Sequence, residues 1–302
     1  MQKLTAWINA ARPRTLPLSI SGILIGAALA SYLGSVNSMV FFLALLTTVG
    51  FQITSNFAND YGDGVKGTDN ENRVGPKRML QSGLLSRAVL KKGIVISVLI
   101  NMVLVVALIY TAFGKENLFL SLFFLLLGVL SVWSAIKYTV GSSAYGYKGL
   151  GDVFVFVFFG LVSVMGALFL FTKSFFFLGI LPATSIGLLS VGVLNLNNLR
   201  DVNSDKESGK NTIIVKIGFE NGKRYHYLLL AGAFISLLVF IYLTYEKWMQ
   251  LLPLLSFVPI FFHFLKVKNT HIPKTLDTEL KKLALSAFSM ALLFYLGYNY
   301  FS

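Results

Sequence analysis

The chain has 302 residues, of which 55% are hydrophobic and only 13% are charged. This is about half the charged share of an ordinary soluble domain, which excludes a soluble globular protein. The sequence has no cysteine, which excludes disulfides, thiol nucleophiles and Cys-ligated metals. A net charge of +13 is also typical of nucleic-acid-binding proteins, but in so apolar a chain it indicates loops that lie against anionic lipid. No nucleic-acid partner is therefore expected.

Apolar segments recur along the whole chain, and each is long enough to cross a hydrocarbon core of about 30 Å as a helix. They predict an all-α membrane protein that forms a single domain over residues 1–302. The first residues lack the apolar core and cleavage site of a signal peptide, so processing is not expected. Nine spans are expected, at about 16–34, 39–58, 94–113, 118–137, 153–172, 175–197, 225–244, 249–266 and 282–301.

The distribution of Lys and Arg indicates how the spans are oriented. If the N-terminus is cytoplasmic and the spans alternate, 23 of the 26 basic residues fall on the cytoplasmic side. Only Lys115, Lys173 and Lys247 fall on the outer loops. Because basic residues collect on the cytoplasmic side, we expect a multi-pass protein of the inner or plasma membrane of the cell. Its N-terminus and its two long polar loops, 59–93 and 198–224, would then be cytoplasmic.

The second predicted span ends in a cluster of amides and carboxylates within NFANDYGDGVKGTD, from Asn56 to Asp69. Asn56, Asn59, Asp60 and Asp63 fall at offsets 0, +3, +4 and +7, which places them on one face of a helix. Carboxylates near hydrocarbon are costly unless a partner compensates them. Helix capping is an alternative for this cluster alone, but it leaves unexplained why carboxylates stand at a helix C-terminus, where the helix dipole disfavours them; a bound cation would explain it.

A matching cluster follows the sixth predicted span, in NLNNLRDVNSDKESGKNT. Asn197, Asp201 and Asp205 fall at offsets 0, +4 and +8, and Asn198 lies beside them. Four spans separate the two clusters, so both helices run in the same direction. The chain is therefore predicted to form two parallel four-helix halves plus a ninth helix. Capping remains an alternative for either cluster alone, but it explains two matching clusters poorly.

Oxygen ligands of this kind suit hard divalent cations, and Mg²⁺ usually takes one or two carboxylates together with substrate phosphates and water. Two facing clusters are therefore predicted to hold Mg²⁺ and to clamp a diphosphate between them. The predicted metal ligands are Asn56, Asp60, Asp63, Asn197, Asp201 and Asp205. Basic side chains near both clusters suit phosphate oxygens, although each alone also fits an ordinary cytoplasmic charge. The candidates for binding the substrate are Lys66, Arg73, Arg78, Arg200 and Lys210, with Asn59 and Asn198.

The two motifs, NxxxDxxD from Asn56 and NxxxDxxxD from Asn197, resemble the aspartate-rich motifs of the UbiA-type intramembrane prenyltransferases. The resemblance covers nearly the whole chain, including the nine spans and the two long loops. The stretches RPRTLPLSISG, RVGPKRMLQSG and YKGLGD are similar to the branch that prenylates 1,4-dihydroxy-2-naphthoate in menaquinone biosynthesis. The DRDxD pattern of the 4-hydroxybenzoate and haem branches is absent from the first motif.

This resemblance implies a reaction. A polyprenyl diphosphate would bind with its head on Mg²⁺ and its tail among the helices, and would lose diphosphate. The naphthoate ring would attack at the carbon that bears its carboxylate, so that CO₂ leaves and demethylmenaquinol forms. Tyr138 and Lys148 are candidates for deprotonating the ring or shielding the cation. Arg12 is a candidate for the naphthoate carboxylate, with snorkelling to the interface as the alternative. The catalytic carboxylates would be Asp60, Asp63, Asp201 and Asp205.

Other functions remain open from the residues alone. A multi-span transporter also has intramembrane carboxylates and repeated halves, but its sites tend to lie near the midplane rather than at helix ends. A prenyltransferase for another aromatic acceptor, such as 4-hydroxybenzoate, is the alternative within the enzyme class. A lipid-binding assembly protein without catalysis is a weaker third alternative. His226, His263 and His271 lack metal-ligand spacing and are assigned no role.

Overall fold

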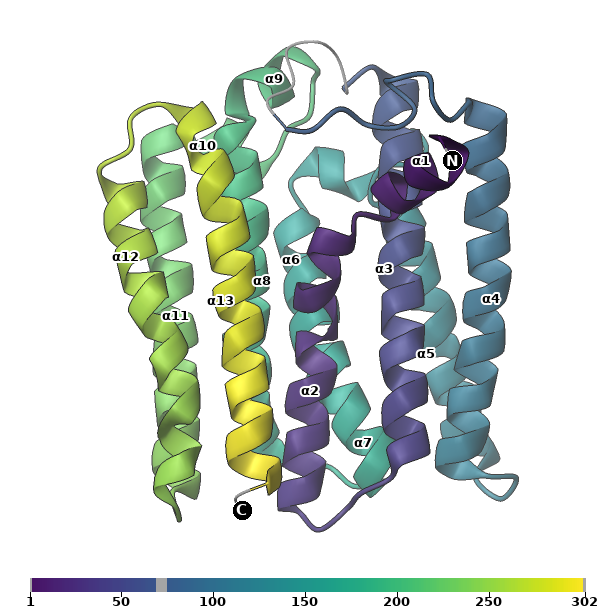
Figure 1. Cartoon of the computed structure of the whole chain (residues 1–302), viewed down its shortest axis with the longest axis vertical. Helices are drawn as coiled ribbons and strands as arrows, with labels where there is room; N and C mark the ends of the chain where they lie inside the picture. Colours follow the sequence, from purple (N-terminus) through teal and green to yellow (C-terminus); the bar gives the residue numbers. More distant parts are fainter. Residues whose placement is uncertain (1, 69–74, 301–302) are drawn as a thin grey trace.

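The computed structural model describes residues 2–68 and 75–300, and its helices run side by side along one long axis (Figure 1). Within these residues, nine helices or continuous helical segments are long and apolar enough to cross a membrane. The predicted all-α membrane fold with nine spans is therefore confirmed. Arg73, one of the predicted diphosphate ligands, lies outside the described residues.

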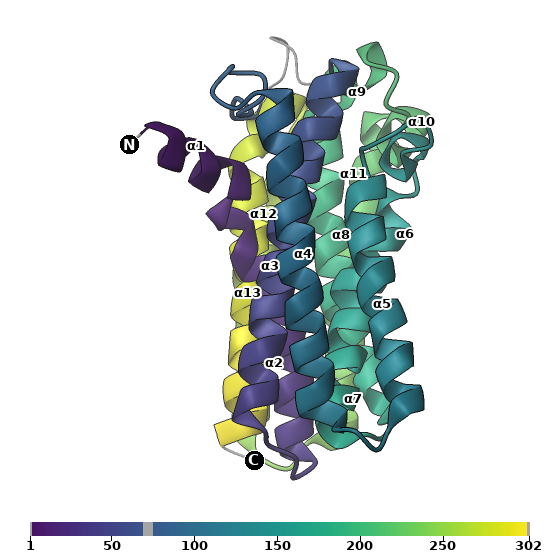
Figure 2. The same ribbon diagram turned by 90° about the vertical axis from the view of Figure 1, so that its right-hand side faces the viewer.

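The first half of the chain supplies four spans. The amphipathic helix α1 (Gln2–Ala11) protrudes near one end of the bundle, and the turn Pro13–Thr15 leads from it into the first span (Figure 2). The four spans are α2 (Leu16–Tyr32), α3 (Ser38–Lys66), α4 (Arg87–Phe113) and α5 (Leu118–Lys137). Polar caps set the starts of two of these spans: the Asn37 side chain accepts hydrogen bonds from N–H groups in the first turn of α3, and the Ser86 side chain accepts one from the first turn of α4.

The second half begins with a span that changes its helix type. α6 (Gly151–Val155) continues through a π-helical stretch, Phe156–Gly166, into α7 (Ala167–Thr172). The later spans are α8 (Ile180–Arg200), α11 (Phe219–Thr244), α12 (Phe257–Lys268) with the preceding 3₁₀ segment Trp248–Ser256, and α13 (Asp277–Tyr295). Short elements in the loops include the 3₁₀ turn Tyr145–Lys148, α9 (Val202–Glu207) and α10 (Ile213–Ile217). The π-helical stretch is notable because such segments often occur at functional sites.

The first polar cluster lies inside a helix rather than beyond its end. The second span was predicted to end near residue 58. In the structure α3 continues to Lys66, so its last two turns include Asp60 and Asp63. The helix can continue because neighbouring elements supply partners for these carboxylates. It ends at Gly67, whose φ of 73° is a conformation that favours glycine.

The second polar cluster is divided between two helices. The spacing predicted one continuous helical face, but α8 ends at Arg200 and Asp201 forms the junction with α9. Asn197 therefore lies in α8 and Asp205 in α9. The backbone nonetheless keeps helix-like hydrogen bonds across the junction, from Asp201 N–H to the Asn197 carbonyl and from Asp205 N–H to the Asp201 carbonyl. The three side chains consequently stay close together despite the break.

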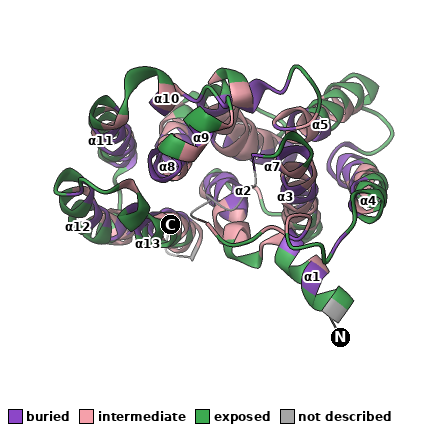
Figure 3. Cartoon of the chain, turned by 90° about the horizontal axis from the view of Figure 1, so that it is seen from above, coloured by how far each residue is buried: buried purple, intermediate pink, exposed green. Residues whose placement is uncertain are grey.

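The core lies inside a ring of helices in which α2 occupies a central position (Figure 3). α2 packs against α3, α7, α13 and the π-helical stretch, while α8 packs against α11, α13 and the same stretch. Large apolar side chains are exposed on the outer helices, as contact with lipid requires. Examples are Leu99, Val103, Phe119, Tyr242 and Phe262. The protein is therefore an integral membrane protein.

Two glycines let α2 approach the π-helical stretch very closely. A Cβ atom at Gly22 would lie 2.0 Å from Ser163 Oγ, and one at Gly26 would lie 2.6 Å from the carbonyl oxygen of Val164. Any larger residue would therefore push the two segments apart. This close packing against α2 fixes the position of the π-helical stretch, which forms one wall of the cavity described below.

Candidate active site

The two predicted clusters lie at the same end of the bundle, because α3 and α8 run in the same direction (Figure 1). Their four carboxylates are nearly inaccessible: the exposed fraction is 1% for Asp60, 8% for Asp63, 6% for Asp201 and 3% for Asp205. Buried carboxylates are costly unless they are paired or hydrogen-bonded. The partners of these four groups therefore define the site.

Asp60 fixes the loop that precedes α4. Its two carboxylate oxygens accept hydrogen bonds from the backbone N–H groups of Met79 at 3.0 Å and Leu80 at 3.3 Å. Arg78, a predicted diphosphate ligand, directly precedes this contact and is half-buried. Asp60 therefore sets the position of the backbone from which the Arg78 side chain extends.

Asp63 is bound by a tyrosine that the sequence analysis did not select. The hydroxyl of Tyr147, in the 3₁₀ turn before α6, donates to Asp63 Oδ1 at 2.7 Å and lies 2.6 Å from the Thr68 hydroxyl. Lys66 Nζ lies 3.7 Å from the centroid of the Tyr147 ring, a cation–π contact. Burial and the neighbouring Asp63 charge raise the pKa of Tyr147. This tyrosine therefore stays a neutral donor to the first cluster.

Lys210 lies between the two clusters. Its Nζ atom is 3.6 Å from Asp205 Oδ1 and 5.7 Å from the centroid of the Tyr147 ring. Burial lowers the pKa of Lys210, but the carboxylates of Asp205 and Asp63 outweigh burial and raise it. Burial raises the pKa of Asp205 to about 6, against the opposing effect of Lys210. One buried ammonium group thus interacts with a carboxylate from each half of the chain.

Arg200 organises the second cluster. Its Nε and Nη2 atoms donate to the two oxygens of Asp201 at 2.8 and 2.6 Å, and Nη2 also donates to Asn197 Oδ1 at 2.9 Å. Its Nη1 atom donates to Asp277 Oδ1 at the start of α13, at 2.6 Å. Arg200 is predicted as a diphosphate ligand, yet all three of its nitrogen atoms bind protein groups. In this geometry it positions Asp201 and joins α8 to α13.

Two buried oxygens of the second cluster, Asn198 Oδ1 and Asp205 Oδ2, have no hydrogen-bond partner in the described part of the chain. Buried polar atoms are rarely left unpaired, so such atoms indicate a place for an ion or water. Both are hard oxygen donors of the kind that Mg²⁺ takes, so the donor chemistry fits this ion. Across residues 2–68 and 75–300, no three acidic or histidine side chains stand at the spacing of a preformed metal site.

Asn56 lies deeper and connects α3 to the N-terminal turn. Its Nδ2 donates to the Ala11 carbonyl at 2.8 Å and to Thr15 Oγ1 at 3.2 Å, and its Oδ1 accepts from Gln52 at 3.2 Å. Arg12 Nη2 lies 3.5 Å from the Asn56 carbonyl oxygen, and Arg12 has a left-handed backbone with φ of 51°. These contacts position the Arg12 backbone near α3. A role for Asn56 as a metal ligand stays a prediction.

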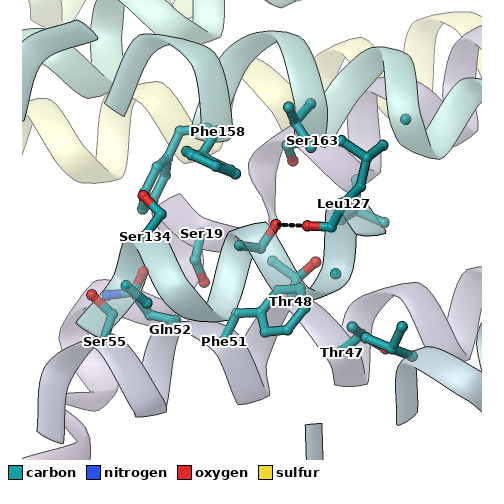
Figure 4. Close-up of a pocket in the computed structure, with 18 of the residues that line it drawn as sticks. Ser19, Thr47, Thr48, Phe51, Gln52, Ser55, Leu127, Ser134, Phe158 and Ser163 are labelled. Carbon is teal, nitrogen blue, oxygen red and sulfur yellow. Dashed lines mark hydrogen bonds between the residues drawn. The ribbon is translucent and has the colours of Figure 1, made fainter. Parts of the chain in front are cut away.

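A cavity of about 350 Å³ extends from this end of the bundle into the membrane-spanning region. Residues of α2, α3, α4, α5, α8 and the π-helical stretch line it, and most of its wall is apolar. Figure 4 shows Gln52, Ser55 and Ser134 on one side of the cavity, with Phe51 and Phe158 further along it. The cavity therefore has the shape of a site for an amphiphile with a long apolar part.

Tyr138 connects the cavity to the clusters. It lines the cavity together with Asn59, whose Oδ1 accepts a hydrogen bond from Thr139 at 3.2 Å. Burial raises the pKa of Tyr138 to about 12; the Lys210 charge lowers this pKa and the Asp63 charge raises it. The ring of Tyr145, which also lines the cavity, lies edge-on to the Tyr138 ring with centroids 5.4 Å apart. Two aromatic rings thus stand between the buried charges and the apolar space.

The structure brings several predicted residues together and leaves others apart. Asp63, Asp205, Lys66 and Lys210 lie near one another, and Asp63, Asp205 and Lys210 also act on Tyr138, which lines the cavity. Lys148, predicted beside Tyr138, is exposed, and its carbonyl oxygen accepts a hydrogen bond from Lys216. Its neighbour Tyr147 enters the site instead, because the 3₁₀ turn directs adjacent side chains to different sides. The stretch YGYKGLGD contained this signal, but the spacing of its residues gave no reason to choose Tyr147.

Buried carboxylates and cations above an apolar cavity define an intramembrane enzyme site for a substrate with an anionic head and an apolar tail. Comparison with known families agrees with this class, because residues 19–293 match the UbiA prenyltransferase family. The chain belongs to the UbiA prenyltransferase family. The resemblance seen in its two aspartate-rich motifs is thereby confirmed.

Characterised relatives cover most of the chain. It is 46% identical over 240 residues to the 1,4-dihydroxy-2-naphthoate octaprenyltransferase of Escherichia coli (strain K12), covering 80% of this chain and 77% of that protein. It is 41% identical over 298 residues to the protein of the same name from Haemophilus influenzae, covering 98% and 96%. The corresponding Mycobacterium tuberculosis protein is 35% identical over 253 residues, covering 82% and 81%.

Solved structures share the fold at low sequence identity. The apo UbiA homologue from Aeropyrum pernix K1 aligns with a TM-score of 0.70 at 15% identity, over 93% of this chain and 96% of that one. The Archaeoglobus fulgidus UbiA homologue bound to GPP and Mg²⁺ aligns with a TM-score of 0.66 at 12% identity, over 96% and 99%. The helical arrangement is therefore that of the UbiA fold.

Proposed function

We propose that the protein transfers a polyprenyl group from a polyprenyl diphosphate to 1,4-dihydroxy-2-naphthoate, with release of diphosphate and CO₂. The product is demethylmenaquinol, an intermediate of menaquinone biosynthesis. One observation carries this proposal: Lys210 and Tyr147 link carboxylates of both halves, and these charges act on Tyr138, which lines an apolar cavity. The names of the relatives, which cover up to 98% of this chain, support the choice of acceptor.

The charged groups suit the diphosphate head. The Nζ atoms of Lys66 and Lys210 lie 3.7 and 5.7 Å from the centroid of the Tyr147 ring and provide N–H donors for phosphate oxygens. Arg78 extends from the loop that Asp60 holds and is a third proposed cation for the diphosphate. The proposed ligands of Mg²⁺ are Asp60, Asp63, Asp201 and Asp205, with Asn198 beside them. When bound, Mg²⁺ neutralises the charge that develops on the departing diphosphate.

The aromatic residues suit the reacting carbon. Tyr138 lies where the polar site meets the cavity, and with a pKa of about 12 it remains a neutral phenol. Its ring and that of Tyr145 can face the allylic cation and stabilise it through their π electrons. Both rings also exclude water, which would otherwise capture the cation. Of the two roles predicted for Tyr138, shielding of the cation is therefore favoured over deprotonation.

The proposed transfer needs no base at the attacked carbon. The allylic C–O bond breaks, and its electron pair leaves with diphosphate. The ring carbon that bears the carboxylate then forms the new C–C bond. Cleavage of the bond to the carboxylate returns an electron pair to the ring and releases CO₂, so no proton has to leave that carbon. This balance agrees with the absence of a charged base among the described residues that line the cavity.

The decisive experiment compares acceptors. Purified protein is incubated with Mg²⁺, an allylic polyprenyl diphosphate and either 1,4-dihydroxy-2-naphthoate or 4-hydroxybenzoate, and products are identified by mass spectrometry. We expect a prenylated, decarboxylated naphthalenediol from the first acceptor and no product from the second. Prenylation of 4-hydroxybenzoate alone would replace the proposed acceptor, and release of diphosphate without any coupled product would contradict prenyl transfer.

A further inference from the structure

A second cavity, of about 310 Å³, opens between α12 and α13. Neither helix lines the cavity of the candidate active site. Six residues surround it: Pro259, Phe262 and His263 of α12, and Glu279, Lys282 and Ser286 of α13. Three of these residues are ionisable, although they lie in membrane-spanning helices. Ionisable residues in such positions are costly and generally functional.

The polar wall of this cavity is held in place by a chain of hydrogen bonds. Glu279, only 1% exposed, accepts from Lys282 Nζ at 2.6 Å and is bonded to His263 Nδ1 at 2.8 Å. The other nitrogen of His263, Nε2, lies 2.9 Å from Nε2 of His226 in α11. From the sequence, neither histidine was assigned a role, since they lack metal-ligand spacing. Together they fix the Glu279 carboxylate at the cavity wall.

Several polar groups in the wall have bonding capacity left over. The Lys282 side chain is 63% exposed, and its ammonium group uses one of three N–H donors on Glu279. Ser286, only 7% exposed, also lines the cavity, and its hydroxyl is one more potential donor. The carboxylate of Glu279 uses two of about four acceptor sites. The wall thus offers one anionic acceptor and two donors to a ligand.

These groups follow one another in depth along one face of α13. Residues 279, 282 and 286 are spaced by three and four, so their side chains share a helical face. α13 starts beside the second aspartate cluster, where Asp277 binds Arg200, and runs from there into the membrane-spanning region (Figure 1). The helical rise places Lys282 about 4.5 Å and Ser286 about 10.5 Å deeper than Glu279. On α12, the exposed Phe262 adds apolar surface beside them.

We propose that this cavity binds the headgroup of a phospholipid with a primary ammonium group, of the phosphatidylethanolamine type. The ammonium donates to Glu279, the phosphate accepts from Lys282, and a glycerol ester oxygen accepts from Ser286. The acyl chains then lie against Phe262 and the outer face of α12. The order of anionic acceptor, cation and neutral donor matches the order of ammonium, phosphate and ester in a lipid of the adjacent leaflet.

Charge complementarity selects this headgroup over the other common ones. A choline headgroup has no N–H group to donate to Glu279. An anionic glycerol headgroup has no cation for Glu279 and adds a negative charge beside the carboxylate. A primary ammonium both donates hydrogen bonds and pairs with the buried charge, which makes such contacts stronger than neutral ones. The site therefore distinguishes lipids by their amine rather than by their phosphate.

Lipid binding to the purified full-length protein tests this inference. Native mass spectrometry and thermal unfolding in detergent are measured with phosphatidylethanolamine, phosphatidylcholine and phosphatidylglycerol of identical acyl chains. We expect phosphatidylethanolamine to bind about tenfold more tightly than phosphatidylcholine, as loss of a charge-assisted bond implies, and to raise the melting temperature most. Equal binding of the ethanolamine and choline lipids, or tighter binding of phosphatidylglycerol, would overturn the proposal.

Variants locate the effect on this cavity. Glu279→Gln should abolish the preference for phosphatidylethanolamine over phosphatidylcholine. Lys282→Met should weaken the binding of both lipids about tenfold by removing the phosphate partner. Lys281→Met is the matched control, because Lys281 is an exposed neighbour that does not line the cavity, and it should leave both affinities within twofold. Because Lys282 is largely exposed, its variant should fold; an equal response of the Lys281 and Lys282 variants would contradict the site.

Discussion

The two carboxylate clusters have nearly the same residue spacing but different partners. On α3, both aspartates accept hydrogen bonds from uncharged groups, which are backbone N–H groups and a tyrosine hydroxyl. At the junction of α8 and α9, Asp201 is paired with Arg200 and Asp205 with Lys210. The direct hydrogen-bond partners of the carboxylates are thus neutral donors in one half of the chain and paired cations in the other, while Lys210 acts on Asp63 as well as on Asp205.

This difference in partners separates the contribution of each cluster to the chemistry from its contribution to the stability of the fold. Loss of one partner from a buried ion pair leaves an uncompensated charge, which is strongly destabilising. Loss of a charge that is held by neutral donors leaves no such charge behind. We therefore infer that the α3 cluster serves mainly the chemistry, whereas the α8–α9 cluster serves both the chemistry and the packing of α8 against α13.

The largest expected effect comes from removing the divalent cation, since both clusters are proposed to bind it. Excess EDTA should abolish prenyl transfer, and added Mg²⁺ or Mn²⁺ should restore it, because the carboxylates alone repel the departing diphosphate. Product formation is followed by mass spectrometry in protein freed of metal. Full turnover in excess EDTA would show that the lysines suffice and that neither cluster is a metal site.

A second test asks whether the two clusters share one side of the membrane. Single cysteines are easily introduced, because the chain has none. Ser82→Cys lies on the loop held by the first cluster and Lys206→Cys on the helix of the second, and both positions are exposed. An impermeant thiol reagent added to intact cells should label neither, but it should label Ser174→Cys at the opposite end of the bundle. Labelling of only one of the first two would separate the clusters.

A matched pair of substitutions sharpens the comparison between the clusters. Asp63→Asn and Asp201→Asn each remove one charge, and each should slow prenyl transfer about 10³-fold, equivalent to ~4 kcal/mol of transition-state stabilisation. Their stabilities should differ. Asp63→Asn should cost about 1 kcal/mol, because the amide oxygen still accepts from Tyr147. Asp201→Asn should cost about 3 kcal/mol, because Arg200 loses its bidentate partner.

Both variants are measured for initial rate at saturating substrates and for unfolding in detergent. The double variant should lose far less than the product of the two single losses, because both carboxylates act on one transition state. Equal stability losses for the two single variants would remove the distinction between the clusters. Multiplicative rate losses would indicate two independent sites.

The sequence predicted most of the fold because membrane spans follow from apolar length alone. Helical spacing also predicted that Asp60 and Asp63 share one face of a helix, and both lie in α3, whereas the second cluster is divided between α8 and α9. The sequence misplaced the end of α3, because the polar residues after residue 58 resemble a loop when the groups that bind their side chains are unknown. The partners come from residues 79, 80 and 147, which no local pattern connects to α3.

The supporting residues were harder to predict than the motif residues. Arg200 matched a diphosphate ligand by its position, but its bonds to Asp201 and Asp277 depend on how α8 meets α13. His226 and His263 are remote in sequence and have no ligand spacing, yet adjacent helices bring their rings into contact. Tertiary packing therefore decides which polar residues bind substrate and which hold other residues in place.

The smallest expected effect concerns the neutral donor of the first cluster. Tyr147→Phe removes the hydroxyl that donates to Asp63 but keeps the ring that contacts Lys66. A hydrogen bond to a charged group is worth about 1.5–3 kcal/mol, so the rate of prenyl transfer should fall about 10- to 150-fold. The fold should be retained, because the ring still fills its space. Initial rates and melting curves measure the two effects separately.

Tyr225→Phe is the matched control for this substitution. Its hydroxyl also donates to a buried aspartate, Asp152 Oδ2, at 3.0 Å, but this pair joins α11 to α6. Both variants lose one tyrosine–aspartate bond, so they should lose similar stability, while only Tyr147→Phe should lower the rate substantially. If both variants lower the rate equally, the loss reflects general packing. If Tyr147→Phe keeps the full rate, the neutral donor has no catalytic role and the contrast between the clusters concerns stability alone.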